Sequence, residues 1–275
     1  MRRLLSLIVL TALTALVSAS PVLAEGAASP KLGLQTWTCR NLTFEQMVGF
    51  AVKHQIKYLE CYSAHFDPLG SKEETLRKKA LLEKNGLTMY SFGVAQTSPD
   101  KEANRKLFEF ARLLGIKLII VEPGSVEIWD NLEELVKEYD IRLAVHNHNL
   151  NSIYGNPFTV KAILHGRDPR IGVCLDVGWV TAAGFDAAKV FTEYGGRVFD
   201  LHFKDKTIEL SEGKSVPVDT LIGQGMANYS GLFAALKQSG WSGVLAIETD
   251  SKSFAEDPAP LVDGAAAYFQ KAFAP

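Results

Sequence analysis

The sequence contains few cysteines, almost no excess charge and no low-complexity linker. Three cysteines among 275 residues, Cys39, Cys61 and Cys174, are too few for a scaffold built on disulfide bonds. A net charge of −2 offers no basic face, so we expect no nucleic-acid partner. No low-complexity segment divides residues 32–273, which predicts one domain over residues 25–275.

Only the N-terminus contains a long apolar run. Residues 1–24 begin with two arginines, continue with an apolar stretch and end in Val-Leu-Ala, a pattern typical of a secretory signal peptide. The run is shorter than the roughly 20 apolar residues of a membrane span, and no cysteine follows for lipid attachment. We therefore expect export to a bacterial periplasm, without membrane attachment after cleavage. In that oxidising compartment, Cys39 and Cys61 would either form a bridge or remain free thiols.

Short β-branched or aromatic runs alternate with stretches of helical periodicity along the rest of the chain. The eight predicted strands cover residues 32–37, 58–62, 88–94, 118–123, 142–148, 171–176, 198–204 and 244–249. A helical stretch follows each of them, and this regular count favours a closed (β/α)8 TIM barrel over an open doubly wound sheet. An open sheet that binds nucleotides would need a glycine-rich loop after its first strand, where this chain has QTWTCRNLT.

Ionisable side chains gather at the predicted C-terminal ends of the strands. They are Glu60, Glu122, His146, His148, Asp176, His202, Lys204 and Glu248. Taken singly, each could be a helix cap, a member of an ion pair or a core histidine. Six of eight strands end this way, however, at the end of the barrel where active sites lie. Carboxylate oxygens mixed with imidazole nitrogens suit Mn²⁺, Mg²⁺, Co²⁺ or Zn²⁺.

The alternation of side chains along a strand places His146 and His148 on one side and Asn147 on the other. By the same rule, Cys174 shares the side of Asp176, one layer deeper. Several aromatic residues follow or end strands, where they either stack on the apolar faces of a sugar or fill the barrel mouth as core. They are Trp37, Tyr62, Phe92, Trp129 and Trp179.

The longest connection, residues 206–231, follows the seventh predicted strand and has no strong periodicity. Loops of this length in compact domains are often functional lids. Gly223 and Gly225 within it would let the backbone turn close to a substrate. Lys204, just before the loop, either neutralises an oxyanion or pairs with Asp176 or Glu248.

Six motifs in this order and spacing resemble the sugar isomerase/epimerase superfamily with the xylose isomerase-like barrel. They are VEPG, AVHNHN, CLDVGW, DLHFKD, GQG and AIETD. The resemblance covers essentially the whole chain after the signal peptide, and in detail it is most similar to the exported branch that acts on 3-keto-glycosides. The motifs are specific for the superfamily and not for the reaction, because members include isomerases, epimerases, dehydratases, lyases and nucleases.

The resemblance implies one divalent metal ion. Asp176, His202 and Glu248 match the superfamily's metal ligands. His146 stands where many epimerases have a glutamate, and Glu122 replaces that carboxylate, so both join the predicted ligand set. Trp179 stands where members of the superfamily often have a histidine that contacts the substrate. In this chain that contact is either absent or replaced by stacking on the indole ring.

The resemblance further implies metal-dependent enolisation of a keto sugar. Glu248 or Glu122 would take the proton, His146 or His148 would act as acid, and Lys204 would face the oxyanion. The predicted substrate contacts are Trp37, Glu60, His148, Trp179 and Lys204. Reprotonation would give an epimer or an isomer, and loss of a β substituent would make the enzyme a lyase or dehydratase.

Export and the lack of a phosphate cradle after the last two strands favour a neutral glycoside over a sugar phosphate. The alternatives are a non-catalytic sugar-binding protein, an inosose dehydratase-like enzyme and an endonuclease IV-like enzyme. A nuclease would need more histidine ligands and a basic groove. The apolar helix at residues 265–273 packs either onto the barrel or across a homodimer.

Overall fold

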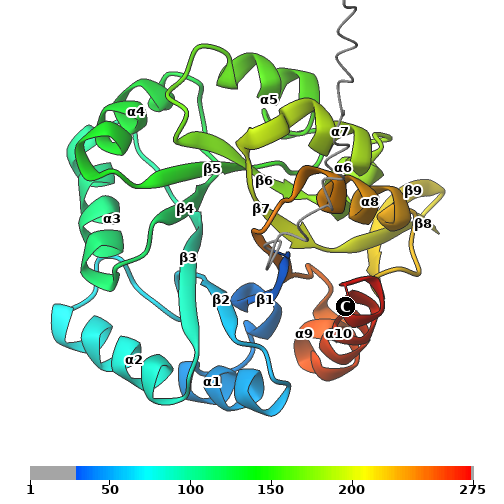
Figure 1. The fold of residues 1–275 in the computed structure, drawn as a ribbon, viewed down its shortest axis with the longest axis horizontal. Coiled ribbons are helices and arrows are strands. Elements are labelled where there is room, and N and C mark those ends of the chain that lie inside the picture. Colours follow the sequence, from blue (N-terminus) through cyan, green and yellow to red (C-terminus); the bar gives the residue numbers. More distant parts are fainter. Residues whose placement is uncertain (1–28, 274–275) are drawn as a thin grey trace, which may run out of the picture.

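Eight parallel strands close into a barrel in the computed structural model, which describes residues 29–273 (Figure 1). The barrel strands are β1 (Lys31–Gln35), β2 (Tyr58–Cys61), β3 (Thr88–Ala95), β4 (Leu118–Val121), β5 (Arg142–His146), β6 (Ile171–Asp176), β7 (Val198–Phe203) and β10 (Val244–Ile247). Their order around the barrel is β1-β10-β7-β6-β5-β4-β3-β2. The predicted (β/α)8 barrel is confirmed, with every strand at its expected place. The predicted signal peptide lies outside the described residues.

Helices surround the barrel (Figure 1). The main ones are α1 (Phe44–Lys53), α2 (Lys72–Lys84), α3 (Lys101–Leu114), α4 (Ile128–Tyr139), α5 (Pro157–Leu164), α7 (Ala187–Tyr194), α8 (Tyr229–Ser239) and α10 (Ala259–Phe273). Short helical turns are η1 (Thr36–Cys39), α6 (Val177–Ala182), η2 (Gly195–Arg197) and α9 (Lys252–Glu256). Within residues 29–273, no helix combines the length and apolar character needed to cross a membrane. The apolar face of α10 packs onto the barrel through Leu261, Val262 and Ala265.

Side-chain alternation divides each strand between the helices and the barrel interior. On β4, Ile119 and Val121 join the large core under the helices, whereas Leu118 and Ile120 join a small cluster inside the barrel with Ala144 and Cys174. Because barrel strands are covered on both faces, they are apolar along their length until they end. Residues two positions beyond the interior cluster therefore project into the C-terminal mouth, which is where Glu122, His146 and Asp176 lie.

The connection after β7 is an antiparallel hairpin of β8 (Asp205–Ser211) and β9 (Lys214–Thr220), so our expectation of a loop without secondary structure is wrong. Glu212 and Gly213 form its two-residue turn, both with positive φ, as the common hairpin turns require. The sequence signal is the alternation of Ile208 with Leu210 on one side of the turn and of Val216 with Val218 on the other.

The GQG motif wraps around a buried carboxylate. Asp205 accepts backbone hydrogen bonds from Gly223 (3.0 Å), Gly225 (2.9 Å) and Ala227 (3.1 Å). A Cβ atom on Gly225 would lie 2.2 Å from Asp205 Oδ1, so this position has no room for a side chain. We expected Gly223 and Gly225 to let the backbone approach a substrate. In the structure they instead bring backbone N–H groups to Asp205.

We expect Gly225→Ala to lower the free energy of unfolding by about 1–3 kcal/mol, because the methyl group overpacks the Asp205 cradle. Urea unfolding followed by circular dichroism measures this change. Gly264→Ala in α10 is the matched control, because a Cβ atom at that position would meet no described atom within 4 Å. It should be neutral or slightly stabilising. Equal stability of the two variants would contradict the proposed role of Gly225.

Candidate active site

A pocket of about 370 Å³ opens at the C-terminal end of the barrel. The predicted site residues on its wall are Trp37, Glu122, His146, His148, Trp179, His202, Lys204 and Glu248. Asp176 and Glu60 lie deeper, because both are fully buried (0% exposed) and neither lines the pocket. The strand ends thus bring most of the predicted residues together around one cavity, in two layers.

The ends of β5 and β6 are locked together by Asn147. The backbone N–H of Asp176 donates to Asn147 Oδ1 (2.7 Å), and Asn147 Nδ2 donates to the Asp176 carbonyl (3.1 Å). The alternation predicted for VHNHN turns Asn147 away from the two histidines, and this pair of hydrogen bonds fixes it there. As a result, His146 Nε2 lies 3.5 Å from Asp176 Oδ2.

Asp176 is the meeting point of the site. Its Oδ1 accepts a hydrogen bond from the Trp179 backbone (2.8 Å) and caps α6. Its Oδ2 lies 3.6 Å from His202 Nδ1, which is in turn 4.0 Å from Glu248 Oε2. Burial alone would raise the pKa of Asp176, but Lys204 and the two imidazoles, His146 and His202, hold this pKa well below its usual range.

Five buried polar atoms of the pocket region have no hydrogen-bond partner among the described residues, although Lys204 forms ion pairs with the two carboxylate oxygens. They are His146 Nδ1, Asp176 Oδ2, Trp179 Nε1, His202 Nδ1 and Glu248 Oε2. Their nearest charged neighbours belong to the site itself. Lys204 pairs with both carboxylate oxygens, Glu122 Oε2 lies 3.8 Å from His146 Nδ1, and Asp176 Oδ2 lies 3.6 Å from His202 Nδ1. His146, Asp176 and His202 each offer a ligand atom, and these atoms lie within 4.8 Å of one another. Nitrogen and carboxylate donors of this kind fit a divalent metal ion.

A lysine occupies part of the same space. Lys204 is almost fully buried, and its Nζ lies 3.3 Å from Asp176 Oδ2 and 2.8 Å from Asp250 Oδ2, and also contacts Glu248. Burial lowers the pKa of Lys204, but these carboxylates outweigh it and raise the pKa well above the usual value. A Cβ atom on Gly178 would lie 2.7 Å from Lys204 Cγ, so the glycine in DVGW makes room for the lysine stem. The sequence left two roles open for Lys204, contact with an oxyanion or pairing with Asp176 or Glu248. The structure contains both ion pairs.

Glu248 belongs to this charged group. Burial raises the pKa of Glu248 to about 7, although the nearby Lys204 opposes the shift. A carboxyl group that titrates near neutral pH can accept and release a proton under ordinary conditions. Asp250, two residues further on, has its pKa lowered to about 2, because Lys204 and Lys206 outweigh the effect of burial.

Glu122 lies on the other side of the pocket beside both histidines of VHNHN. Its Oε1 accepts a hydrogen bond from Ser152 (2.5 Å), and its Oε2 lies 3.8 Å from His146 Nδ1. His148 Nδ1 is 3.9 Å from Glu122 Oε1. Partial burial would raise the pKa of Glu122, but His146 and Ser152 lower it below the usual value, so the group is an ionised carboxylate.

A second buried layer lies directly below His202. Glu60 Oε2 is 3.2 Å from His202 Nε2, and Gln35 Nε2 donates to Glu60 Oε1 (3.2 Å). Burial would raise the pKa of Glu60, yet His202 lowers it. In this position Glu60 contacts His202 and does not line the pocket, so its predicted contact with a substrate stays a prediction.

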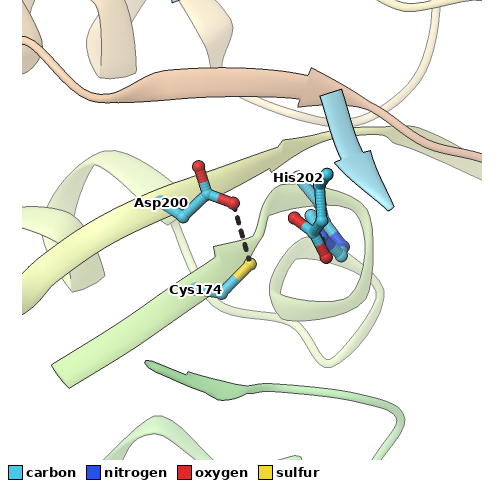
Figure 2. Close-up of side chains that lie close together, drawn as sticks. Cys174, Asp200 and His202 are labelled. Carbon is cyan, nitrogen blue, oxygen red and sulfur yellow. Dashed lines mark hydrogen bonds and ion pairs between the residues drawn. The ribbon is translucent and has the colours of Figure 1, made fainter. Parts of the chain in front are cut away.

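Cys174 and Asp200 complete that layer (Figure 2). Cys174 Sγ donates to Asp200 Oδ2 (3.8 Å), and the Tyr90 hydroxyl lies 3.1 Å from each carboxylate oxygen of Asp200. Burial and the neighbouring Glu60 raise the pKa of Asp200 well above its usual range. Sequence reasoning missed Asp200, although it lies two residues before His202 and therefore on the same side of β7.

The hairpin packs behind Trp179, which lines the pocket. Lys206 Nζ lies 3.7 Å from the centroid of the Trp179 ring and pairs with Asp219 on β9. The Trp179 ring also meets His148 edge to face, with centroids 4.9 Å apart. A cation over an indole face is a stabilising contact, so Trp179 is held between the hairpin and His148.

Asp219, which sequence reasoning missed, ties the hairpin to the segment after β10. It accepts hydrogen bonds from Thr249 Oγ1 (2.7 Å) and from the backbone of Asp250 (2.5 Å) and Ser251 (3.2 Å). Arg40 holds the other side of this segment by donating to the carbonyl oxygens of the same three residues. The segment that carries Glu248 is therefore fixed from both sides.

The sequence also left alternatives open for several aromatic residues and for the cysteines. Trp37 is 38% exposed and meets Tyr62 edge to face at the pocket rim, with ring centroids 5.6 Å apart. Phe92 and Trp129 are buried core residues. The cysteines are free thiols, and burial raises the pKa of Cys39 to about 12. The bridge between Cys39 and Cys61 is not formed.

Comparisons with known proteins identify the family. The family model described as "Xylose isomerase-like TIM barrel" matches residues 48–272. Over 142 residues, the chain is 21% identical to an inosose dehydratase of Lacticaseibacillus casei, covering 47% of this chain and 46% of that relative. The chain therefore spans about half the length of the curated relatives it matches.

Solved structures share the fold over most of the chain. A crystal structure of an uncharacterized protein from Parabacteroides distasonis ATCC 8503 is 28% identical with a TM-score of 0.67, covering 88% of this chain and 98% of that one. A structure described as IOLI protein with a bound zinc atom has a TM-score of 0.72 at 16% identity, covering 88% and 97%. The superfamily predicted from the six motifs is thereby confirmed.

We expect Glu60→Gln to lower the free energy of unfolding by about 3 kcal/mol or more, because it removes one member of a buried charge pair. The pKa of His202 is raised well above its usual value, so the stabilisation from its charged form is complete below about pH 6.5 and fades as pH rises through the folded pKa. The difference between wild type and variant should therefore narrow at alkaline pH.

Chemical denaturation at several pH values, with a metal chelator present, measures this difference. Glu45→Gln is the matched control, because its pair with Arg77 is half exposed, and it should leave the stability essentially unchanged. A loss from Glu60→Gln no larger than that of the control would show that the pair with His202 is not a stabilising interaction.

Proposed function

Because this chain belongs to the xylose isomerase-like TIM barrel family, we propose that it is a divalent-metal-dependent enzyme that enolises a keto sugar. The proposed substrate is a 3-keto-glycoside, and the proposed outcome is elimination of its anomeric substituent. One observation carries the proposal: His146, Asp176 and His202 offer ligand atoms within 4.8 Å of one another, beside a pocket whose wall also holds a lysine and three carboxylates.

The residues that would hold the metal are His146, Asp176, His202 and Glu248. Their nitrogen and oxygen donors fit a divalent ion, although Lys204 pairs with the two carboxylates in this structure, and the zinc in the IOLI structure of the same fold is consistent with such an ion. When bound, such an ion supplies Lewis-acid polarisation of a carbonyl group. Glu122 stands behind His146, in the position of the carboxylates that orient metal-binding imidazoles. We therefore assign Glu122 to orientation and proton transfer, with direct ligation left to the other four.

The proton chemistry is assigned to residues on the pocket wall. Glu248 takes the proton on C2 of the sugar, next to the C3 carbonyl, because its raised pKa makes it a base near neutral pH. Lys204 lies beside Glu248 and neutralises the negative charge that develops on the C3 oxygen. His148, 37% exposed in its side chain, can exchange protons with solvent and serves as the acid.

The bonds balance without an oxidant or reductant. Loss of the C2 proton leaves its electron pair as a C2–C3 double bond, with the negative charge on the C3 oxygen. The C3 carbonyl then reforms, the pair moves to a C1–C2 double bond, and the bond from C1 to the anomeric oxygen breaks. His148 protonates that oxygen as it leaves. The inosose dehydratase relative carries a name that denotes an elimination, which supports this outcome.

Epimerisation is the second candidate, favoured by the position of Glu122. β4 and β10 lie diametrically opposite in the barrel, with three strands between them in either direction. Glu122 follows β4 and Glu248 follows β10, so the two carboxylates face the pocket from opposite sides. One carboxylate could remove a proton from one face of a sugar and the other return a proton to the opposite face.

Export, which the N-terminal sequence predicts, bears on the substrate. Sugar phosphates are made inside cells, and the pocket wall holds carboxylates in numbers that disfavour a phosphate group. Trp37 and Trp179 present ring surface to the pocket, as suits the apolar face of a neutral sugar. A neutral oxidised glycoside therefore fits better than a phosphorylated sugar.

We expect Glu248→Gln to reduce turnover at least about 100-fold, because the amide cannot take a proton. The metal-loaded protein is incubated in heavy water with 3-keto-glucosides and free ketoses, and NMR follows deuterium incorporation and products. Elimination gives an unsaturated sugar, and epimerisation gives deuterium at the inverted carbon. Glu209→Gln on the exposed part of β8 is the control and should retain full activity.

Three results would overturn the proposal. Full activity of Glu248→Gln would contradict the role of Glu248 as the base. Full activity of protein freed of metal by a chelator would contradict the metal dependence. Sugar binding without exchange or product in the wild type would favour the non-catalytic binding protein instead.

We expect Lys204→Met to strengthen divalent metal binding at least about 10-fold, a change of about 1.4 kcal/mol. The ammonium group of Lys204 neutralises the same Asp176 and Glu248 oxygens that a metal ion would contact, so its removal ends a competition. Isothermal titration calorimetry measures the affinity. Lys214→Met, on the exposed tip of the hairpin, is the control and should bind metal like the wild type. Weaker binding by Lys204→Met would show that the lysine assists the metal rather than competing with it.

A further inference from the structure

A second pocket of about 410 Å³ adjoins the candidate active site on the side of β3. The two pockets share four wall residues, Ser63, Val94, Ala95 and Gln96. Ser63 and Gln96 are both exposed, so they form a rim between the two hollows. We call this second pocket the β3 groove. A molecule seated in the active site can extend over this rim into the groove.

The wall of the β3 groove exposes mainly apolar surface, although only half of its fourteen residues are apolar. The apolar residues include Pro68, Leu69, Phe92, Val94 and Leu107. Leu69 is 74% exposed and lies on the groove wall, so its side chain is accessible to a ligand there. An apolar ligand at this place would remove the leucine surface from water, and that burial is favourable in proportion to its area.

The polar residues of the groove do not form an anchor for a charged ligand. Asn104 is buried, but its side chain is already bonded to Ser98 and Asn131. Asp67 and Lys106 carry opposite charges and are exposed at the margin. The Thr97 hydroxyl lines the groove and has no hydrogen-bond partner among the described residues. The groove therefore suits an apolar group that carries at most one or two polar atoms.

A second sugar ring fits the groove less well than an aromatic ring. Proteins usually hold sugars by exposed aromatic faces and several hydrogen-bonding side chains, but Phe92 is only 1% exposed. The aliphatic side chains of Leu69 and Val94 instead offer apolar contact and no hydrogen bonds. These features separate an aromatic occupant from a carbohydrate one.

We propose that the β3 groove binds the aglycone of the substrate, and that this aglycone is an aromatic or similarly apolar group. The inference rests on the proposed function, in which the anomeric substituent must leave the active-site pocket. The groove adjoins that pocket and has the chemistry to hold the substituent before and during its departure. The enzyme is thereby specific for aryl 3-keto-glycosides over alkyl ones.

Turnover tests the specificity. The wild-type kcat/KM for a phenyl 3-keto-glucoside should exceed that for the methyl compound of the same configuration at least 10-fold, mainly through KM. Leu69→Asp places a charge in the groove and should abolish this preference while leaving the methyl compound unaffected. Leu210→Asp makes the same change at an exposed leucine (81%) on the hairpin and should keep the preference. Equal kcat/KM for both substrates in the wild type, or an equal loss on both in Leu69→Asp, would overturn the proposal.

A binding measurement separates this inference from the proposed function. Phenyl glucoside carries no keto group and cannot be enolised, so its contacts with the protein do not depend on activity. Saturation-transfer NMR should show its aromatic protons in contact with wild type and Leu210→Asp, and not with Leu69→Asp or with Ala103→Trp, which fills the groove. Missing aromatic contact in the wild type overturns the aglycone site, even if keto sugars are turned over. Aromatic contact without any turnover overturns the proposed function alone.

Discussion

The Asp176 carboxylate, fully buried at the end of β6, faces three groups that carry or can carry positive charge. One of its oxygens caps α6, and the other lies within 3.6 Å of His146, His202 and Lys204. An isolated charge at such a depth is costly, so the carboxylate is stable only with these partners in place. The partners are equally dependent on it, since each of them is buried as well. Asn147 and the cap of α6 fix the carboxylate, and the rest of the site is arranged around it.

This arrangement produces a site in layers. Glu60 and Asp200 lie below His202, the imidazoles and Lys204 lie around Asp176, and the pocket with its tryptophans lies above. Each layer is one step of side-chain alternation further along the strands, so the barrel itself sets their spacing. The hairpin of β8 and β9 supports one side of the site from behind, because Asp219 joins it to the segment after β10. On the side of β3, the pocket shares wall residues with the β3 groove.

Much of this could be predicted from the sequence, for physical reasons. Strands covered on both faces must be apolar until they end, so the ionisable residues at Glu122, His146, Asp176, His202 and Glu248 mark both the strand ends and the barrel mouth. Alternation correctly separated Asn147 from its two neighbours. The depth of a side chain in the barrel was not predictable. The pattern of one strand shows which side of the sheet a residue faces, but not its height along the barrel relative to residues on other strands. Glu60 was therefore expected in the pocket and lies below it.

Other features were missed because they depend on distant contacts. Asp219 and Asp250 lie 31 residues apart in sequence and meet only because the hairpin folds back on the barrel. The hairpin itself left a weak signal, two short alternations around Glu212 and Gly213. Lys204 was ambiguous for a similar reason, since its partners Asp176 and Asp250 come from different strand ends. Sequence periodicity identifies elements well and identifies pairings between elements poorly.

X-ray absorption spectroscopy of the zinc-loaded protein tests the central claim most directly, because it identifies the atoms bound to the metal. His146, Asp176, His202 and Glu248 predict one zinc ion with nitrogen and oxygen ligands at about 2.0–2.2 Å and no sulfur. The deeper group of Glu60, Cys174, Asp200 and His202 also offers four donor atoms within 4.8 Å of one another. A sulfur ligand at about 2.3 Å would place the metal in that deeper group and contradict the account, as would the absence of bound zinc.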